Sequence, residues 1–529
     1  MNDNAAAHPS ASDSPLDVRR LAGPATFTLA AQAVRVAATM ALTVWVSRLL
    51  GPEALGMLTL GLTLATAATV IACIGVDQGV IYFVARAQPR DVPTSTPDTS
   101  DLSGSPGGVD GLADAPSTAP AEAPAAIRTA LAVAAGGGLA IGSLAWILAP
   151  VAADTVFGEP ALRRVLLILA PSIPIAAVFA TALGALQGSF RVAHRATLEW
   201  IVFPLLTLAL AVGFSISRDG IEGVAIGYLV AWIASSVVTI AIVLRIEGAT
   251  RPLMFRRMLT FSLPLMFSLL TGYLLFHIDV LMLGGLSSVR EVGLYGVATR
   301  LALPLFLVLD SVGRAFTPLA AHLYVEGRAR RLAIVYGAAT EWIMAINVPA
   351  GLFIGLNAEP ILALFGLEFV AATAALRVLC LGVVLATACG AAAPMLTMTR
   401  WQRLEMVDNL LLLVLNVILN LALVPRFGAL GAALATASSA GSVYALKVLQ
   451  VRWLLSMQPF RSRQAAAIGL ALVAAATAWL STRPVALSPT SELALRGVVF
   501  FATYGALWWR WGCSDTSREV LRSMGRRLT

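Results

Sequence analysis

The sequence is poor in charged, histidine and cysteine residues, and it contains one lysine, Lys447. Of its 529 residues only 12% are charged, four are histidine and four are cysteine. The rest is apolar, with 58% hydrophobic residues and a mean hydropathy of +0.82. A chain with so few polar side chains cannot cover a soluble globule of this size. No histidine–cysteine metal spacing, Walker loop or G-x-S-x-G element is present, so we expect no metal, no cofactor and no catalytic residue. The protein is not expected to be an enzyme.

Uncharged stretches of about twenty residues recur along the chain, and each is long enough to cross a bilayer as a helix. Fourteen such spans are predicted, at residues 22–46, 55–84, 128–151, 162–187, 198–216, 222–245, 259–284, 292–320, 332–356, 369–397, 405–425, 429–454, 464–481 and 493–510.

Arginine alternates between the breaks that separate these spans. One side collects pairs and triplets, among them Arg19 and Arg20 before the first span, whereas the opposite loops hold few. By the positive-inside rule, both termini are cytoplasmic and the protein is a multi-pass component of the inner, or cytoplasmic, membrane. The net charge of +8 is mostly this bias, so nucleic acid is not an expected partner.

The spans form two copies of one pattern. Phe157-Gly158 is echoed by Phe365-Gly366, and Gly56 by Gly293 at a larger offset. The segment 88–125 lies between the two sets of landmarks, and the two offsets agree once most of it is treated as an insertion. Because this segment is rich in Pro, Ser, Gly and Asp, we expect it to be a disordered cytoplasmic loop. The predicted fold is therefore all-α, with about 14 transmembrane helices in two parallel-repeat six-helix lobes plus two C-terminal helices. The predicted parts are a disordered N-terminus (1–21), an N-lobe (22–245, spans 1–6), a C-lobe (259–454, spans 7–12), spans 13 and 14 (464–510) and a basic tail (511–529).

Polar residues inside the spans are candidates for function, because a charge at the bilayer centre costs about 2.5–3.5 kcal/mol on insertion scales. In the first span Thr28, Gln32, Arg35 and Thr39 fall within roughly 60° of one helical face. We expect this stripe to face a cavity; a structural interhelical bond is the alternative.

The eighth span carries Arg300, Asp310 and Arg314, of which the last two are four residues apart and can neutralise each other. Asp279 on the seventh span is a possible partner of Arg300. His277, which can titrate near neutral pH, is a candidate for proton coupling or a packing residue.

The eleventh span presents Asn409, Asn416 and Asn420 on one face, where they either form interhelical bonds or line a polar cavity. Arg35 and Arg300, without an acidic residue in the first span, favour an anion, and arginine forks match phosphate oxygens.

Several stretches resemble bacterial polysaccharide flippases of the O-antigen type, within the multidrug/oligosaccharidyl-lipid/polysaccharide exporter superfamily. They include GPATFTLAAQAVRVAATMALTVWVSRLLGPEALGMLTLGLTL near the start, FSLPLMFSLLTGYLLFHIDVLMLGGLSSVREVGLYGVATRL in the middle, and NVILNLALVPRFGALGAALATASS.

The resemblance implies a V-shaped bundle that moves an undecaprenyl-diphosphate-linked glycan to the outer leaflet, for a polysaccharide such as lipopolysaccharide or exopolysaccharide. Arg35 and Arg300 match the family's cationic positions. Besides this cargo and the bilayer, a polysaccharide polymerase and other assembly proteins are possible partners.

Three alternatives remain open at this level. A cation-coupled multidrug exporter would require an acidic residue deep in the first or seventh span, which Asp279 meets in part. A peptidoglycan lipid-precursor flippase would be essential for viability. A membrane-embedded glycosyltransferase or polymerase would require large outer loops, whereas the loops here are short.

Overall fold

The computed structural model describes residues 15–87, 122–217, 220–245, 254–460, 462–482 and 488–512, except for the side chains of residues 15–26, 28–29, 122 and 462–465. The predicted disordered loop and the basic tail lie almost entirely outside these residues, as does most of the predicted N-terminal segment. The helices α1 and α3 begin at Pro15 and Glu122, earlier than the first and third spans were expected to start.

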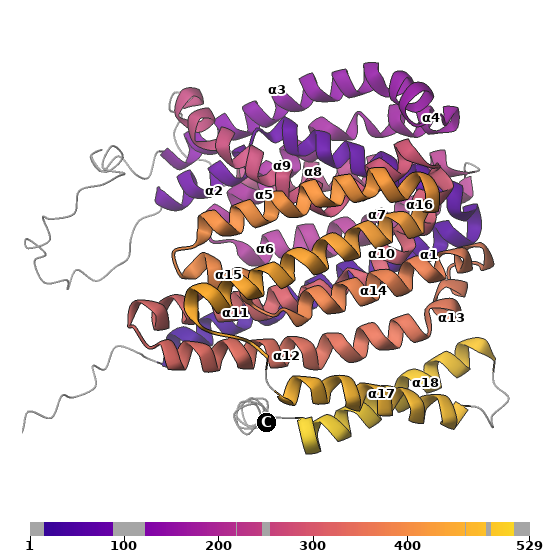
Figure 1. The fold of residues 1–529 in the computed structure, drawn as a ribbon. Coiled ribbons are helices and arrows are strands. Elements are labelled where there is room, and N and C mark those ends of the chain that lie inside the picture. Colours follow the sequence, from indigo (N-terminus) through magenta and orange to yellow (C-terminus); the bar gives the residue numbers. More distant parts are fainter. Residues whose placement is uncertain are drawn as a thin grey trace, which may run out of the picture. The chain divides into compact units, whose positions relative to one another are not determined.

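The described residues form helices and no strands, which confirms the predicted all-α class (Figure 1). The helices of the first half are α1 (Pro15–Cys73), α2 (Val76–Arg86), α3 (Glu122–Val151), α4 (Pro160–Leu169), α5 (Ser172–Gly188), α6 (Val192–Ala196), α7 (Phe203–Ser217) and α8 (Ile221–Leu244). Those of the second half are α9 (Phe255–Leu286), α10 (Val289–Ala302), α11 (Pro304–Val325), α12 (Ala329–Leu356), α13 (Ala358–Ala363), α14 (Thr373–Ala388), α15 (Ala392–Met398), α16 (Gln402–Leu455), α17 (Ser462–Thr482) and α18 (Pro489–Leu507).

Within the described part of the chain, nine helices are long and apolar enough to cross a membrane, or ten if the bent pair α4–α5 is one span. The count is lower than the fourteen expected because α1 and α16 each contain two helices joined at a kink, at Gly51 and Gly428. The apolar part of α16 alone covers 54 residues. At 1.5 Å per residue that is about 80 Å, more than twice the hydrocarbon thickness. Counting each kinked helix as two spans, and adding α17 and α18, restores the expected number.

The chain divides into two compact units. Unit 1 contains the described residues of 1–41, 65–149 and 166–272, and unit 2 contains those of 42–64, 150–165 and 273–529. The stretches 42–64 and 150–165, which the sequence had placed in the N-lobe, thus group with the second half of the chain.

Small side chains and close helix packing hold each unit together. Apolar helices associate in this way in a membrane, because lipid is as apolar as the helices and the hydrophobic effect does not drive them together. The core of unit 1 is built from α2, α3 and α5, with Val76, Val80, Ala130, Ile173 and Ala177 among its buried residues. Unit 2 has one apolar cluster that includes Tyr336 of α12 and Val451 of α16, and another where Phe500 of α18 packs near Ala474 of α17.

Two glycines in unit 2 allow a close helix crossing. A Cβ atom on Gly56 would lie 1.8 Å from the carbonyl oxygen of Val289, and one on Gly293 would lie 1.9 Å from that of Pro52. The contact is reciprocal, because each glycine faces the residue four positions before the other. These are the two glycines that the repeat pattern paired, and the backbones of α1 and α10 touch where they meet.

A carboxylate caps the start of the second half of α16, directly after the kink. Gly428 has φ 55°, in the left-handed region, and the helix restarts at Ala429. Glu291 of α10 accepts a hydrogen bond from the Ala429 N–H at 2.7 Å. The first N–H groups of a helix lack intrahelical partners, so this carboxylate acts as a cap from a different helix.

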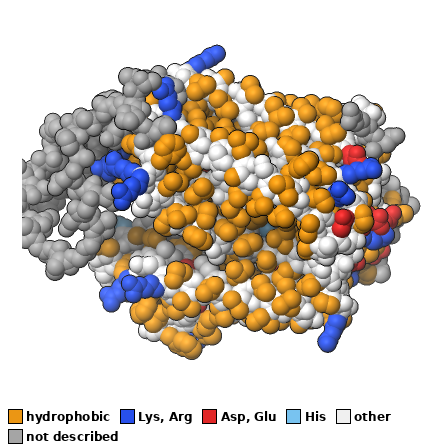
Figure 2. All heavy atoms as spheres, turned by 90° about the horizontal axis from the view of Figure 1, so that it is seen from above, with side chains coloured by type: hydrophobic (Ala, Val, Ile, Leu, Met, Phe, Trp, Pro, Cys, Tyr) orange, Lys and Arg blue, Asp and Glu red, His pale blue; other side chains and the backbone are white. Residues whose placement is uncertain are grey.

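Hydrophobic side chains cover most of the face shown in Figure 2, and few charged side chains interrupt them. In α9, only 11% of the most apolar window is buried within the protein. Such an exposed apolar surface is what lipid contact requires.

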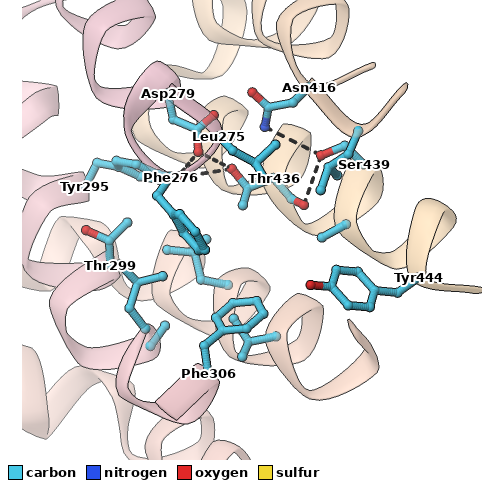
Figure 3. A pocket seen from close by; sticks show the side chains of 16 residues that line it. Leu275, Phe276, Asp279, Tyr295, Thr299, Phe306, Asn416, Thr436, Ser439 and Tyr444 are labelled. Atoms are coloured by element: carbon cyan, nitrogen blue, oxygen red, sulfur yellow. Dashed lines mark hydrogen bonds between the residues drawn. The ribbon is translucent and has the colours of Figure 1, made fainter. Parts of the chain in front are cut away.

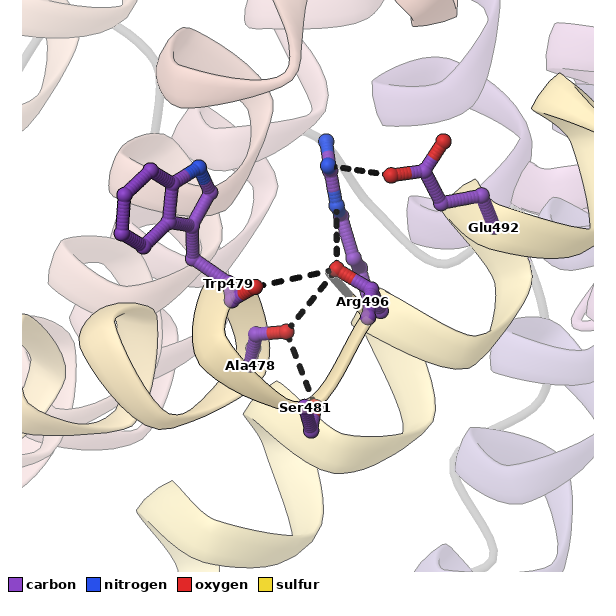
Figure 4. A network of polar contacts seen from close by, with 6 residues as sticks. Ala478, Trp479, Ser481, Glu492 and Arg496 are labelled. Carbon is purple, nitrogen blue, oxygen red and sulfur yellow. Dashed lines mark hydrogen bonds and ion pairs between the residues drawn. The ribbon is translucent and has the colours of Figure 1, made fainter. Parts of the chain in front are cut away.

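The hairpin of α17 and α18 is closed by a polar network (Figure 4). Arg496 of α18 donates to the Thr482 hydroxyl at 3.1 Å and forms an ion pair with Glu492. Thr482 in turn bonds the carbonyl oxygens of Ala478 and Trp479 at 3.3 and 3.2 Å. Arg496 therefore ties the end of α17 to α18.

Candidate functional site

A buried polar cluster surrounds Asp279 in unit 2 (Figure 3). The Asp279 side chain is 5% exposed. Its Oδ2 atom accepts from the Tyr295 hydroxyl at 2.9 Å and from the Thr436 hydroxyl at 2.5 Å, and its Oδ1 atom accepts from Asn420 Nδ2 at 2.9 Å. The carboxylate is thus held by three neutral donors, contributed by α10 and by both halves of α16.

Helical spacing explains why these side chains meet. Asn416 and Asn420 are one turn apart on the first half of α16, and Thr436 and Ser439 are three apart on the second half. Asn416 Nδ2 reaches the Ser439 hydroxyl at 3.5 Å. The two halves of α16 therefore face each other with hydroxyl and amide groups, on either side of a cavity of about 80 Å³ that Asp279 also lines.

Oxygen acceptors are crowded around one amide group. Asn420 Nδ2 lies within 3.0 Å of Asp279 Oδ1, the Asn416 carbonyl oxygen and Asn416 Oδ1, although an amide nitrogen has two hydrogens. The Asn420 Oδ1 atom has no partner within the described structure. Rotating this amide by 180° would bring four oxygens together, a donor set suited to a hard cation or a proton.

Arg300 lies in the same unit, on α10. It is seven residues after Gly293, so both residues lie on nearly the same helical face, within about 20°. Its guanidinium donates to the hydroxyls of Thr43 at 2.9 Å and Thr59 at 3.4 Å. The glycine crossing thus brings Arg300 against both halves of α1 beyond the kink region.

The stripe predicted on the first span belongs to unit 1. Arg35 and Thr39 are exposed and Gln32 is half-buried; the side chain of Thr28 lies outside the described residues. The Thr39 hydroxyl bonds the Arg35 carbonyl oxygen at 2.8 Å. Within the described part of the chain, the Arg35 guanidinium makes no hydrogen bond or ion pair. The joint role of this stripe and Arg300 remains a prediction.

The remaining candidates have local partners. Arg314 pairs with Asp310 one turn earlier on α11, at 2.5 Å, with both side chains more than half exposed. This is the self-neutralising arrangement that the sequence left open. The His277 ring packs against the Tyr273 ring at 4.3 Å between centroids, and the Tyr273 hydroxyl bonds the Thr63 carbonyl oxygen at 2.9 Å.

Sequence reasoning missed the neutral partners of the charged groups. Thr43, Thr59 and Thr436 are threonines within apolar helices, where such residues commonly bond their own backbone. Tyr295 lies within the middle stretch that resembles the polysaccharide flippases, in Val292-Gly293-Leu294-Tyr295, and this was the one available signal. No group of three His, Cys, Asp or Glu side chains that could hold a metal occurs among the described residues.

Known proteins share the fold and two sequence signatures. A family model described as polysaccharide biosynthesis protein matches residues 111–324, and the MatE model matches residues 264–422. No curated protein gives a significant sequence match.

Solved structures match over nearly their whole length. A structure of the lipid II flippase MurJ in an inward closed conformation has a TM-score of 0.70 at 12% identity, covering 92% of this chain and 99% of that one. An inward-facing multidrug resistance MATE family transporter has a TM-score of 0.59 at 17% identity, covering 82% and 98%. A MOP superfamily transporter from Pyrococcus furiosus has a TM-score of 0.51 at 16% identity, covering 83% and 95%.

The fold, its apolar helices and these likenesses define a multi-pass, all-α membrane protein. Two family models match parts of the chain, and its fold is that of the MurJ and MATE structures, so the chain resembles the MOP superfamily of flippases and exporters.

Proposed function

We propose that the protein is a flippase for an undecaprenyl-diphosphate-linked oligosaccharide, the repeat unit of a surface polysaccharide. It moves this lipid from the inner to the outer leaflet of the cytoplasmic membrane by alternating access, with both termini cytoplasmic. The match to the polysaccharide biosynthesis model supports a glycan cargo, and the likeness to a lipid II flippase supports a lipid-linked one.

The observation that carries the proposal is the exposed guanidinium of Arg35. It lies within the apolar part of α1, where a charge is expensive and usually faces a partner or a water-filled cavity. Within the described residues that partner is not a protein group. A diphosphate provides it, because phosphate oxygens accept paired hydrogen bonds from a guanidinium.

Arg300 serves the same diphosphate in this proposal. Its guanidinium donates to the hydroxyls of Thr43 and Thr59, which orient it. Outward movement of an anionic headgroup is favoured by an inside-negative potential, worth about 2.3 kcal/mol per charge per 100 mV.

We further propose that the Asp279 cluster takes up the coupling ion. A carboxylate surrounded by amide, hydroxyl and carbonyl oxygens offers hard ligands to a small monovalent cation. Uptake of that cation would rearrange the contacts of Asn420 and Thr436, and thereby the packing of α9 and α10 on α16.

The test uses reconstituted protein and a fluorescent undecaprenyl-diphosphate glycan. We expect Arg35→Ala and Arg300→Ala each to slow flipping by about 10- to 150-fold, because a hydrogen bond to a charged group contributes about 1.5–3 kcal/mol. Arg452→Ala, at an exposed position of α16, is the matched control and should flip normally. Normal flipping by both variants would refute the anion site.

Two rivals predict different outcomes. A peptidoglycan lipid-precursor flippase, favoured by the TM-score of 0.70, would rescue cells depleted of their own lipid II flippase. A multidrug exporter, favoured by the MatE match, would lower drug susceptibility when expressed. Either result without glycan flipping would replace the proposed cargo.

A further inference from the structure

A second buried cluster of polar side chains lies between the two halves of α16, away from Asp279. We call it the Lys447 cluster; its members are Glu405, Asp408 and Asn409 on the first half of α16 and Lys447 and Gln450 on the second half. The Lys447 ammonium donates to Glu405 Oε1 at 2.6 Å and to Asn409 Oδ1 at 2.9 Å. Gln450 Nε2 donates to Asp408 Oδ1 at 2.9 Å.

The cluster is almost entirely removed from solvent. Lys447 and Asp408 are each 1% exposed and Gln450 is 8% exposed. The side chain of Glu405 is 15% exposed. Burying ionised groups is costly unless their charges are balanced and their hydrogen-bonding atoms are satisfied.

The charges do not balance. Lys447 and Glu405 form a salt bridge, whereas the Asp408 carboxylate forms none within the described residues, so the ionised cluster carries one net negative charge. The Tyr444 ring lies 5.1 Å from the Lys447 nitrogen, and its π face also draws on that single positive charge. The cluster therefore lacks one positive charge.

The hydrogen bonding of the Lys447 cluster is also incomplete. Glu405 Oε2, Asp408 Oδ2 and Gln450 Oε1 are buried and have no partner within the described structure. All three atoms are acceptors, so what is missing is a donor. A proton on Asp408 Oδ2 supplies one, on a carboxyl group whose other oxygen already accepts from Gln450 Nε2.

Within the described residues, no further salt bridge balances the cluster. An apolar cluster around Val448 and Val451 packs beside these residues, and α15 carries no titratable side chain. Outside the Lys447 cluster, the titratable or charged groups of α16 itself, of that apolar cluster and of the helices packed on α16 are Arg256, Arg257, Tyr273, His277, Asp279, Arg290, Glu291, Tyr295, Arg300, Tyr324, Tyr336, Arg377, Cys380, Cys389, Arg403, Arg426, Tyr444 and Arg452. The side chains of Arg403 and Arg452 are exposed. Within the described residues, the one salt bridge of Lys447 is to Glu405.

We propose that the Lys447 cluster is a proton-binding site, in which Asp408 takes up one exchangeable proton. Binding forms one O–H bond, with Asp408 Oδ2 as the receiving atom and a hydronium ion or water as the source. Asn409, Asn416 and Asn420 continue from this site along one face of α16 to Asp279, and Tyr444 lines the cavity that Asp279 also lines. The site is thus the end of a polar row that leads to the proposed coupling site.

Only this use in transport depends on the proposed function; proton binding itself is measured separately. Full-length protein in nanodiscs is examined by infrared difference spectroscopy, in which a protonated carboxyl group gives its own C=O band. We expect a band that is lost in Asp408→Asn and reduced or shifted in Glu405→Gln. Lys447→Met removes the ammonium and should add a second protonated carboxyl. Glu368→Gln, in an exposed ion pair with Arg290, is the matched control and should leave the band unchanged.

A band that Asp408→Asn leaves intact would overturn the site, as would a Lys447→Met spectrum like that of the unsubstituted protein. Displacement of the band by sodium or potassium at fixed pH would identify a metal cation as the occupant and would also refute the proposal. Asp408→Asn replaces one atom, and a folded variant is verified by its thermal melting. If glycan flipping is absent from every form while the band behaves as expected, the proposed function fails and the proton site stands.

Discussion

The crossing at Gly56 and Gly293 leaves no room for a methyl group, and its substitution is the sharpest structural test available. In Gly293→Ala the new Cβ would lie 1.9 Å from the Pro52 carbonyl oxygen and 2.8 Å from its carbon. Backbone atoms cannot rotate away, so α1 and α10 must separate by about 1.5 Å to restore an ordinary contact. Overpacking of this kind costs about 1–3 kcal/mol.

The assay is thermal unfolding of the purified protein, together with the glycan flipping rate. The matched control is Gly441→Ala on α16, where a Cβ would meet nothing within 4 Å. There the higher helix propensity of alanine should stabilise by up to about 1 kcal/mol. Gly293→Ala should therefore melt below the unsubstituted protein, and Gly441→Ala at or above it.

Because the contact is reciprocal, it also predicts how the two substitutions combine. Once Gly293→Ala has moved the two helices apart, Gly56→Ala meets a space already widened. The double variant should then lose less stability than the two single variants together, as expected for residues in direct contact. Equal melting temperatures for Gly293→Ala and Gly441→Ala, or strict additivity in the double variant, would refute this account of the crossing.

Other predictions follow from contacts described above. Glu291→Ala removes the acceptor for the Ala429 N–H and should destabilise by about 0.5–2 kcal/mol, as the loss of a helix cap does; thermal melting measures it, and unchanged melting would contradict the capping role. Asp279→Asn should abolish the dependence of flipping on the coupling cation while the protein still folds, which flipping assays across a cation series would show. Arg496→Ala should speed hydrogen exchange at the end of α17 by loosening Thr482, with a global stability loss of no more than about 1 kcal/mol, since the ion pair is partly exposed.

The sequence predicted well what depends on local pattern. Long apolar runs predicted the all-α class, and the four-residue spacing of Asp310 and Arg314 predicted that they could pair. Asn416 and Asn420 were predicted to share a face, and in the structure they meet at Asp279.

Contacts between distant segments could not be read in this way. Thr436 is 157 residues from Asp279, and it stands in a run of alanines and serines where nothing distinguishes it. Arg300 donates to the hydroxyls of Thr43 and Thr59, which are more than 240 residues away in the sequence. Many threonines lie in similar local sequences, and only the tertiary packing determines which of them contacts a charged side chain. Lys447 lay in an apolar span without a predicted partner, because its acidic neighbour is on the facing half of α16.

The solitary lysine has a practical consequence. Because its amine is sealed inside the pair of α16 segments, no lysine side chain on the surface is available to amine-directed dyes or cross-linkers. Any labelling of Lys447 would report that the two segments had parted, so the native chain carries a built-in reporter of that motion.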